Sequence, residues 1–515
     1  MLNWSAGPRI YEINTRVWLT QLCENYGKSI DLDNIPDEVL DELVSYEIDA
    51  VWLMGVWERG VATRASALNY VHEYRYSLPD IQPDDVIGSA YAVHNYVVEP
   101  AIGGREALAR LRVRLQQRGL RLVLDFVPNH VATDHAAISL HPEYFVQGTP
   151  EQLKRDTTNF FLTHNAKNQP IVIARGRDPY FPGWIDTAQL NVFSPGGRAM
   201  ALEILLDIAS QCDGVRCDMA MLVMNEVFVR SWGWLGLKPP KRDYWETIIP
   251  KVKAQNPEFL FIAEAYWNLE YALQLQGFDY TYDKTMYDRL LKGDVNGIYL
   301  HLTANMNYLK RKIRFIENHD EHRAAAAFGP DRSRPAAALI CTLPGSVLLH
   351  QGQFEGRKVK LPVHIVRQPH EEEFTPLYDF YMNLLAETRD DIYRTGQWSL
   401  FRCYAACNGC EGAGNIVAYG WRKNNDFRLV VVNMVDEWSQ ALIGLNGWLD
   451  ELKDKSWLLY DALHNYYIEE EGSNLAESGG LYVDVEGSSA HIYRFLAVKP
   501  RITRRPVTGR LRQMT

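Results

Sequence analysis

Eight short β-rich runs alternate with helical stretches over roughly the first 390 residues. Several of the runs, such as RLVLDF and FLFIAE, are almost continuously apolar, which is typical of parallel strands covered on both faces. Between them lie amphipathic segments, for example 105–118 and 198–211. The pattern predicts a (β/α)8 barrel, with an open doubly wound sheet as the alternative. The expected strands are 9–15, 49–54, 121–126, 213–218, 259–265, 278–282, 312–318 and 346–350.

Two departures from this alternation predict further domains. About 90 residues separate the third and fourth runs, and 131–191 is rich in Pro, Asn, Asp, His and aromatic residues. A connection of that length indicates an inserted domain, which divides the barrel into 1–130 and 192–392. After Tyr393 the helical period stops, and alternating runs separated by turn clusters predict an antiparallel β-sandwich over 393–498. The last stretch, 499–515, reads as a basic tail.

Composition excludes several classes of partner. The chain has 64 acidic and 54 basic residues and a net charge of −10, which argues against binding nucleic acid or an anionic membrane. No apolar run approaches the ~18 residues of a membrane span, and the N-terminus lacks the pattern of a secretion signal. Seven cysteines, an odd number, suit reduced thiols and a cytoplasmic protein. The spacing of Cys403, Cys407 and Cys410 resembles an iron–sulfur motif, but a structural role is favoured because of its late position. The oligomeric state is left open.

Carboxylates follow four of the expected strands. The third run continues into DFVPNH (125–130), the fourth ends in GVRCD (214–218), the fifth carries Glu264 in FIAEA (261–265), and ENHD (317–320) closes the seventh. In a (β/α)8 barrel the carboxyl ends of the strands meet at one face, where active sites lie. The sequence therefore predicts a cluster of carboxylates at that face.

Two of these acids stand in different local surroundings. Arg216 and Asp218 are two residues apart on a strand, so they point to the same face, and the guanidinium is expected to keep Asp218 ionised. Glu264 lies among apolar neighbours in the sequence, which is expected to raise its pKa. An ionised nucleophile opposite a protonated acid is what retaining glycoside hydrolysis requires. Asp320 would be a third carboxylate, available to oppose positive charge in the transition state.

The four strand ends resemble the four conserved regions of the α-amylase family of glycoside hydrolases. RIYEINTRVW resembles the first strand of that family and LPGSVLLHQGQ the eighth, so the resemblance extends over about 8–497. It implies that 131–191 corresponds to the family's domain B and 393–498 to its domain C. It also implies Asp218 as the nucleophile, Glu264 as the general acid/base and Asp320 as the transition-state stabiliser. The residues implied to contact the sugar at the scissile bond are Tyr91, His130, Arg216 and His319.

The sequence departs from the family pattern on the leaving-group side. Met221 and Leu222 stand where many α-amylases have Lys-His, which predicts an apolar leaving-group side. Ala92 replaces an Asp that is common in exo-acting relatives. The family's frequent calcium site would use Asn129, with Asp156, Asp178 and Asp186 as further candidates. No other cofactor is expected.

The leading prediction is a retaining α-glycosidase that acts on an α-glucoside or α-glucan. A transglycosylase or glycoside phosphorylase that uses the same intermediate is an alternative, favoured by the apolar Met221–Leu222 region. A non-catalytic glycan-binding protein is a further alternative, disfavoured because all three carboxylates are present. Linkage, substrate length and endo or exo action are left open.

Overall fold

The computed structural model describes residues 4, 6–407 and 412–498. The chain divides into two compact units, 1–394 and 395–515. The predicted basic tail, 499–515, lies outside the described residues. Among the described residues, no helix combines the length and apolar character needed to cross a membrane.

The first unit contains a closed barrel of eight strands in the order β1-β15-β14-β13-β12-β11-β5-β2. Every neighbouring pair is parallel, which confirms the (β/α)8 prediction and excludes the open sheet. In chain order the barrel strands are β1 (Arg9–Asn14), β2 (Ala50–Met54), β5 (Arg121–Phe126), β11 (Gly214–Cys217), β12 (Leu260–Ala263), β13 (Tyr280–Tyr282), β14 (Lys312–Arg314) and β15 (Ser346–His350).

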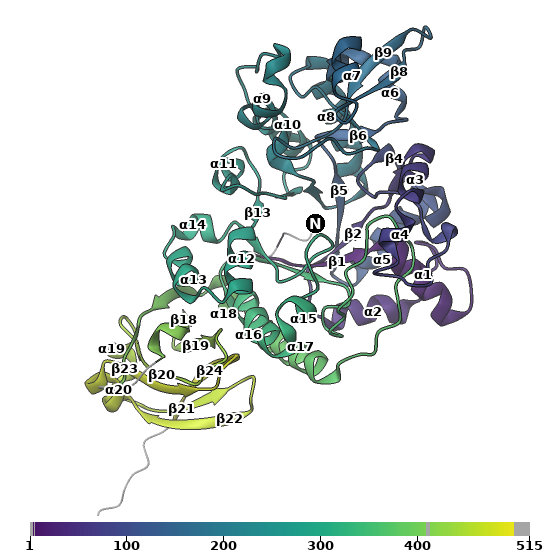
Figure 1. Cartoon of the computed structure of the whole chain (residues 1–515). Coiled ribbons are helices and arrows are strands. Elements are labelled where there is room, and N and C mark those ends of the chain that lie inside the picture. Colours follow the sequence, from purple (N-terminus) through teal and green to yellow (C-terminus); the bar gives the residue numbers. More distant parts are fainter. Residues whose placement is uncertain (1–3, 5, 408–411, 499–515) are drawn as a thin grey trace, which may run out of the picture. The chain divides into compact units, whose positions relative to one another are not determined.

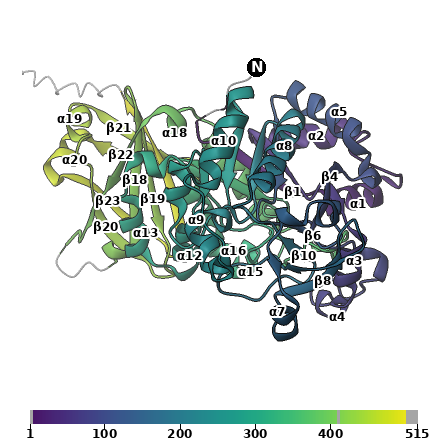
Figure 2. The same cartoon turned by 90° about the horizontal axis from the view of Figure 1, so that it is seen from above.

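The barrel strands are buried on both faces because helices cover them. All six residues of β5 are buried. Helix α5 (Gly104–Gln117) buries a stripe of apolar residues at helical spacing: Ala107, Leu108, Leu111 and Leu115. Helix α8 (Pro195–Gln211) packs between α5 and α10 (Tyr244–Gln255), as Figure 2 shows.

Strands β11 and β12 end one or two residues earlier than the sequence indicated. Asp218 and Glu264 therefore stand immediately after their strands, in the loops at the mouth of the barrel. Backbone bonds still fix their positions, because Asp218 N–H donates to the Phe126 carbonyl at 2.8 Å and Glu264 N–H to the Cys217 carbonyl at 3.1 Å. The barrel thus places both acids on its carboxyl-terminal face.

The long connection after β5 carries its own small sheets (Figure 1). Strand β6 (His130–Ala132) pairs with β10 (Thr187–Gln189), and β9 (Pro170–Ala174) lies between β7 (Gln147–Gly148) and β8 (Phe160–His164). A core of seven buried apolar residues, Val131 and Phe145 among them, underlies these strands. The boundaries 131–191 stay a prediction.

The second unit is antiparallel throughout its described strands, as the sequence predicted. A six-stranded sheet, β16-β18-β19-β24-β21-β22, and a three-stranded sheet, β17-β20-β23, enclose an aromatic core around Phe427 and Trp448. Two strands were not predicted, β20 (Ser439–Gly444) and β22 (Tyr466–Glu471). Strand β22 reads YYIEEE and is largely exposed, because it lies at the sheet edge, where charged residues are common. The prediction of reduced thiols is wrong for Cys407, which is disulfide-bonded.

The remaining bounds are as follows, with η for 3-10 helices: α1 (Thr15–Tyr26), α2 (Asp37–Ser45), β3 (Trp57–Arg59), α3 (Val61–Leu68), α4 (Val71–Tyr74), η1 (Pro83–Asp85), β4 (Val93–Val98), η2 (Pro100–Ile102), α6 (Ala136–Leu140), η3 (Pro142–Tyr144), α7 (Pro150–Arg155), η4 (Ala220–Val223), α9 (Asn225–Trp232), η5 (Gly233–Leu235), α11 (Glu270–Leu275), α12 (Lys284–Lys292), α13 (Val295–Leu302), α14 (Met306–Leu309), α15 (Ala324–Ala327), α16 (Gly329–Thr342), α17 (Thr375–Glu387), α18 (Ile392–Thr395), β16 (Gln397–Phe401), β17 (Cys403–Tyr404), η6 (Ala413–Asn415), β18 (Ile416–Lys423), β19 (Asp426–Asn433), α19 (Leu449–Leu452), β21 (Ser456–Asp461), α20 (Gly472–Ser478), β23 (Gly480–Val485) and β24 (Ser489–Val498).

Candidate active site

A cavity of about 360 Å³ opens at the carboxyl-terminal face of the barrel. Residues from the strand ends line it together with Trp184, Asp186 and Thr187 of the long connection. The structure therefore brings together residues that are far apart in the sequence. The predicted site residues that line this cavity are Tyr91, His130, Asp218, Glu264 and Asp320.

The Arg216 guanidinium lies among the acids of this site and is fully buried. Its Nη1 is 2.9 Å from Asp218 Oδ1, and its Nη2 is 2.9 Å from Glu264 Oε2. Asp125 and Asp320 lie farther away, with carboxylate oxygens at 3.7 and 3.9 Å. One guanidinium therefore lies within 4 Å of four carboxyl groups. Because it contacts both Asp218 and Glu264, these two side chains lie on the same side of the barrel mouth.

This arrangement overturns the expectation that Arg216 keeps Asp218 ionised. Burial and the neighbouring Glu264 carboxylate raise the pKa of Asp218, and the guanidinium opposes that rise without cancelling it. Burial also raises the pKa of Asp125 to about 6, again against Arg216. The sequence shows an arginine beside Asp218, but only the fold shows that the same arginine is shared. Because buried like charges repel, Asp218 is harder to ionise than an ordinary aspartate.

Glu264 has polar contacts where the sequence predicted apolar surroundings. Tyr266 Oη donates to Glu264 Oε1 at 2.8 Å, and the Met219 backbone N–H donates to Oε2. Met219 has φ 40°, in the left-handed region that a non-glycine residue rarely adopts. That conformation turns its N–H toward the carboxylate, and the next N–H, of Ala220, donates to the Glu264 carbonyl at 3.0 Å. The segment after β11 thus fixes the carboxyl group that follows β12.

A second buried cation lies at the end of the ENHD segment. Although burial opposes it, the Asp320 and Glu12 carboxylates raise the pKa of His319 to about 10. His319 Nε2 is 2.8 Å from Tyr91 Oη and 3.0 Å from Asp320 Oδ2, and Nδ1 contacts Glu12. The Tyr91 ring stacks on the imidazole with centroids 5.3 Å apart. Tyr91, His319 and Asp320 therefore form one connected group beside Arg216.

Sequence reasoning missed Glu12, which is completely buried in β1. The available signal was a single acidic residue inside the otherwise apolar run RIYEIN. A fully buried carboxylate requires a charged or hydrogen-bonded partner. The sequence offered no way to identify His319, 307 residues away, as that partner.

His130 is also buried, and this burial lowers the pKa of its ring to about 4, so the imidazole is neutral at physiological pH. Its ring centroid is 5.0 Å from that of Trp184. A neutral imidazole beside an aromatic ring suits contact with a sugar better than it suits ion pairing. His130 thus lines the cavity as predicted, in a different charge state from His319.

The residues proposed for calcium do not fit a calcium site. Asn129 Oδ1 accepts a hydrogen bond from Gln189 Nε2 at 2.9 Å. Asp178 accepts from the backbone of Tyr180 and Phe181. The three aspartates, Asp156, Asp178 and Asp186, form no cluster with converging oxygens among the described residues.

The prediction that Met221 and Leu222 line the leaving-group side is wrong. Both are buried in a 3-10 turn, η4 (Ala220–Val223), because this turn packs into the protein interior. Met219, Tyr266 and Trp184 line the cavity instead.

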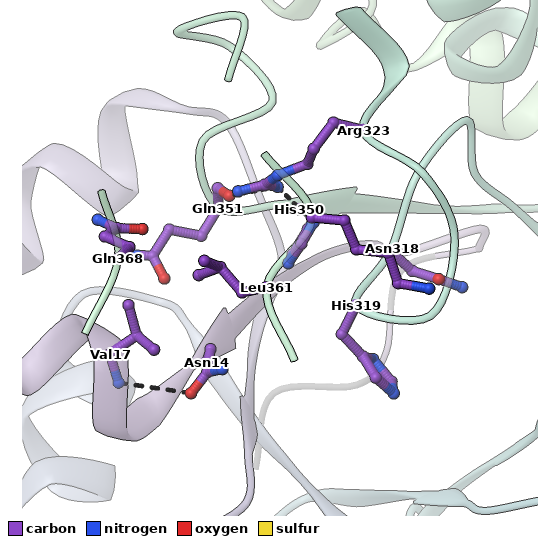
Figure 3. A pocket seen from close by; sticks show the side chains of 10 residues that line it. Asn14, Val17, Asn318, His319, Arg323, His350, Gln351, Leu361 and Gln368 are labelled. Carbon is purple, nitrogen blue, oxygen red and sulfur yellow. Dashed lines mark hydrogen bonds between the residues drawn. The ribbon is translucent and has the colours of Figure 1, made fainter. Parts of the chain in front are cut away.

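Figure 3 shows a second, smaller pocket, which is lined by His319. His319 also contacts Tyr91 and Asp320, which line the first cavity. It lies over the ends of β1, β14 and β15, and most of the residues that line it have polar side chains. Arg323 contributes Nη1, which is 2.6 Å from both Glu317 Oε1 and His350 Nδ1. Lys360 Nζ donates to the Asp320 carbonyl. The other labelled lining residues in Figure 3 are Asn14, Val17, Asn318, Gln351, Leu361 and Gln368.

Fold and site together define a (β/α)8-barrel protein with a carboxylate-lined cavity at the barrel mouth. Residues 27–186 match the model of the α-amylase catalytic domain. The chain is 25% identical over 445 residues to α-amylase MalA of Haloarcula japonica, which covers 84% of this chain and 56% of that protein. It is 20% identical over 387 residues to α-amylase 3 of Dictyoglomus thermophilum, covering 71% of this chain and 67% of that one.

The fold likeness extends over nearly the whole chain. The crystal structure of the noncanonic maltogenic α-amylase AmyB from Thermotoga neapolitana superposes with a TM-score of 0.67 at 18% identity, covering 95% of this chain and 98% of that one. The resemblance to the α-amylase family that the sequence indicated is therefore confirmed. It spans little more than half the length of MalA.

Proposed function

We propose that this protein is a retaining α-glycosidase that acts on an α-glucoside or α-glucan. The observation that carries the proposal is the single guanidinium of Arg216, which holds Asp218 and Glu264 at 2.9 Å each, in a cavity large enough for a sugar ring. Retaining catalysis needs two carboxyl groups roughly 5–5.5 Å apart, one a nucleophile and one an acid.

In the first step an Asp218 oxygen forms a bond to the anomeric carbon while the glycosidic C–O bond breaks. Glu264 gives its proton to the leaving oxygen, and a covalent β-glycosyl enzyme results. In the second step water attacks the same carbon, Glu264 accepts the water proton, and the bond to Asp218 breaks. The product keeps the α configuration because the carbon is inverted twice.

The neighbouring groups support both steps. Arg216 contacts both carboxylates and so orients them as charge moves from one to the other. Asp320, half-exposed and paired with His319, faces the cavity where oxocarbenium charge develops. Tyr91 stacks on His319 and lines the same cavity, in a position to contact the sugar ring.

The alternative functions lose support. The transglycosylase or phosphorylase alternative depended on Met221 and Leu222 lining the leaving-group side, and both are buried. A purely glycan-binding role does not account for two buried acids held at one arginine, an arrangement that is costly unless it is used.

The test compares two variants on two substrates. Asp218→Asn and Glu264→Gln are assayed on a maltooligosaccharide and on α-glucosyl fluoride, whose leaving group needs no proton. Asp218→Asn is expected to lose both activities by roughly 10⁴-fold, because the nucleophile is missing in each. Glu264→Gln is expected to lose oligosaccharide cleavage by at least roughly 10²-fold and to keep most of its glycosyl transfer from the fluoride.

The exposed Asp84→Asn serves as a matched control and should behave like the parent protein. NMR of the first product gives its anomeric form, and an α product is expected. Hydrolysis that survives both substitutions, or a β product, would show that the assignment is wrong.

A further inference from the structure

We propose that Asp461, His464 and His491, here called the histidine cluster, bind a Zn²⁺ ion. All three residues belong to the second unit, so the site does not depend on the function proposed for the barrel. Two imidazole nitrogens and one carboxylate oxygen are a ligand set that zinc takes in proteins.

The pairing of two neighbouring strands brings the three side chains together. Asp461 is the last residue of β21, and Tyr493 of β24 lies directly opposite it. His491 stands two residues before Tyr493 and so points to the same face of the sheet. His464 follows in the turn between β21 and β22. One ligand atom from each of the three lies within 4.8 Å of those of the other two.

Asp461 presents one carboxylate oxygen to both imidazoles. Its Oδ2 lies 2.6 Å from His491 Nδ1 and 3.0 Å from His464 Nδ1. The other oxygen, Oδ1, accepts a hydrogen bond from the Leu463 backbone N–H at 3.0 Å. A bond of this kind orients a ligating carboxylate and leaves its second oxygen for the metal ion.

The turn after β21 holds His464 beside the carboxylate. The Asn465 N–H donates to the Asp461 carbonyl at 2.9 Å, and Tyr460 Oη donates to Asn465 Oδ1 at 3.1 Å. Asn465 has φ 57°, a left-handed conformation that asparagine adopts more readily than most residues. The two imidazole rings lie with their centroids 4.6 Å apart. Ligand atoms around a tetrahedral zinc ion stand about 3.3 Å apart, so only small side-chain movements would admit the ion.

No permanent cation pairs with this carboxylate among the described residues. Asp461 is completely buried, and its ion pairs there are with the two histidines. The buried Asp283, by contrast, has Arg314 beside it. A buried carboxylate needs a positive partner. At the histidine cluster that charge comes either from a proton on an imidazole or from a bound cation, and a divalent ion supplies it without protonating either ring.

The histidine cluster is open to solvent on one side. The side chain of His464 is 45% exposed, whereas that of His491 is 11% exposed. Tyr466 Oη lies 3.5 Å from His491 Nδ1, which places a hydroxyl group beside the site. Zinc in proteins usually has four ligands, so three side chains leave one position that water can fill. The ion can therefore enter past His464, and once bound it would tie the turn after β21 to β24.

The experiment measures metal binding to the full chain by equilibrium dialysis. Metal-free parent protein, Asp461→Asn and His464→Ala are dialysed against Zn²⁺. We expect the parent to bind one ion at this site, and both variants to lose affinity for it by at least about 10²-fold, the upper end for loss of an outer-shell partner alone. His72→Gln, which removes a histidine whose side chain is 73% exposed, is the control and should bind like the parent.

Two further measurements identify the ligands and the effect on the fold. Co²⁺ held by nitrogen and oxygen ligands lacks the intense absorption that thiolate ligands produce, so its spectrum distinguishes the histidine cluster from free cysteines such as Cys23 and Cys403. Zn²⁺ should raise the midpoint of thermal unfolding of the parent and of His72→Gln, but not that of His464→Ala. The metal-free midpoints show whether each variant folds.

The results decide between a metal site and a structural ion pair. A parent that binds neither Zn²⁺ nor Co²⁺ would overturn the proposal, and so would equal affinity in the parent and His464→Ala. A cobalt spectrum dominated by thiolate absorption and unchanged in the variants would overturn it as well. If Asp461→Asn fails to fold because its side chain is buried, His464→Ala decides alone, since His464 lies at the exposed side of the histidine cluster.

Discussion

Two buried charge clusters in the barrel unit have opposite balances of charge. In the first, here called the acid-rich cluster, the Arg216 guanidinium lies within 4 Å of four carboxyl groups, those of Asp125, Asp218, Glu264 and Asp320. In the second, here called the balanced cluster, two acids meet three basic groups. Its members are Asp283, Glu270, Arg314, Lys312 and His301.

The balance of acidic and basic groups in each cluster decides whether the pKa of its buried aspartate is raised or lowered. Although burial opposes it, Lys312 and His301 lower the pKa of Asp283. Burial and Glu264 raise the pKa of Asp218, because one arginine does not neutralise its neighbours. Removing one partner from a satisfied buried ion pair is strongly destabilising, whereas acids with strongly shifted pKa values are common at functional sites. The comparison indicates that the surplus of acids, rather than burial itself, distinguishes the proposed active site.

The largest expected effect separates activity from stability at Asp218. Asp218→Asn should lower kcat by roughly 10⁴-fold. Its midpoint of thermal unfolding should stay unchanged or rise, since the substitution removes one of several competing buried charges. Kinetics and calorimetry on the same preparation check this. A clear drop in the unfolding midpoint would mean that Asp218 is a structural ion-pair partner like Asp283.

The reverse result is expected in the balanced cluster. Asp283→Asn leaves Arg314, whose Nε lies 3.0 Å from Asp283 Oδ2, without that buried carboxylate. Breaking such a pair costs about 3–5 kcal/mol of unfolding free energy. Urea titration measures this loss, with the exposed Asp84→Asn as the matched control. Unchanged stability in Asp283→Asn would contradict the distinction between the two clusters.

The smallest expected effect is on the pH dependence of stability, through His319. The folded-state pKa of His319, about 10, lies above its ordinary value of about 6.5. The stability that its charge contributes is complete below the ordinary value and is lost as pH rises through about 10. Glu12→Gln removes one of the two carboxylates that raise this pKa, so the decline should begin at lower pH.

Unfolding midpoints measured from pH 6 to 10.5 follow this decline. Glu106→Gln, on the exposed surface of α5, is the control and should follow the parent profile. Identical profiles for Glu12→Gln and the parent would show that Glu12 does not hold the charge on His319.

Much of the fold could be predicted from the sequence because the patterns that indicate helices and strands depend on residues close together in the chain. The eight apolar runs, the helical periods between them and the alternating C-terminal runs each depend on neighbours in the sequence. The edge strand β22 was missed because acidic side chains hide its period. Met221 and Leu222 were assigned to the cavity from their distance to Asp218, but a 3-10 turn directs them inward. The period of apolar residues predicts whether a segment is a helix or a strand, but it does not predict which way the side chains of a loop point.

The amino-acid sequence by itself determined the barrel, the positions of the acids at its strand ends and the order in which they occur. These follow from patterns that span a few residues and from the rule that parallel strands end at one face. Only the tertiary structure decided how charge is shared at that face. It placed Arg216 against Glu264 as well as Asp218 and Glu12 against His319. It also brought the ring of Tyr180 against that of Trp267. Electrostatic and ring contacts act through space, so they depend on distances that no spacing along the chain contains.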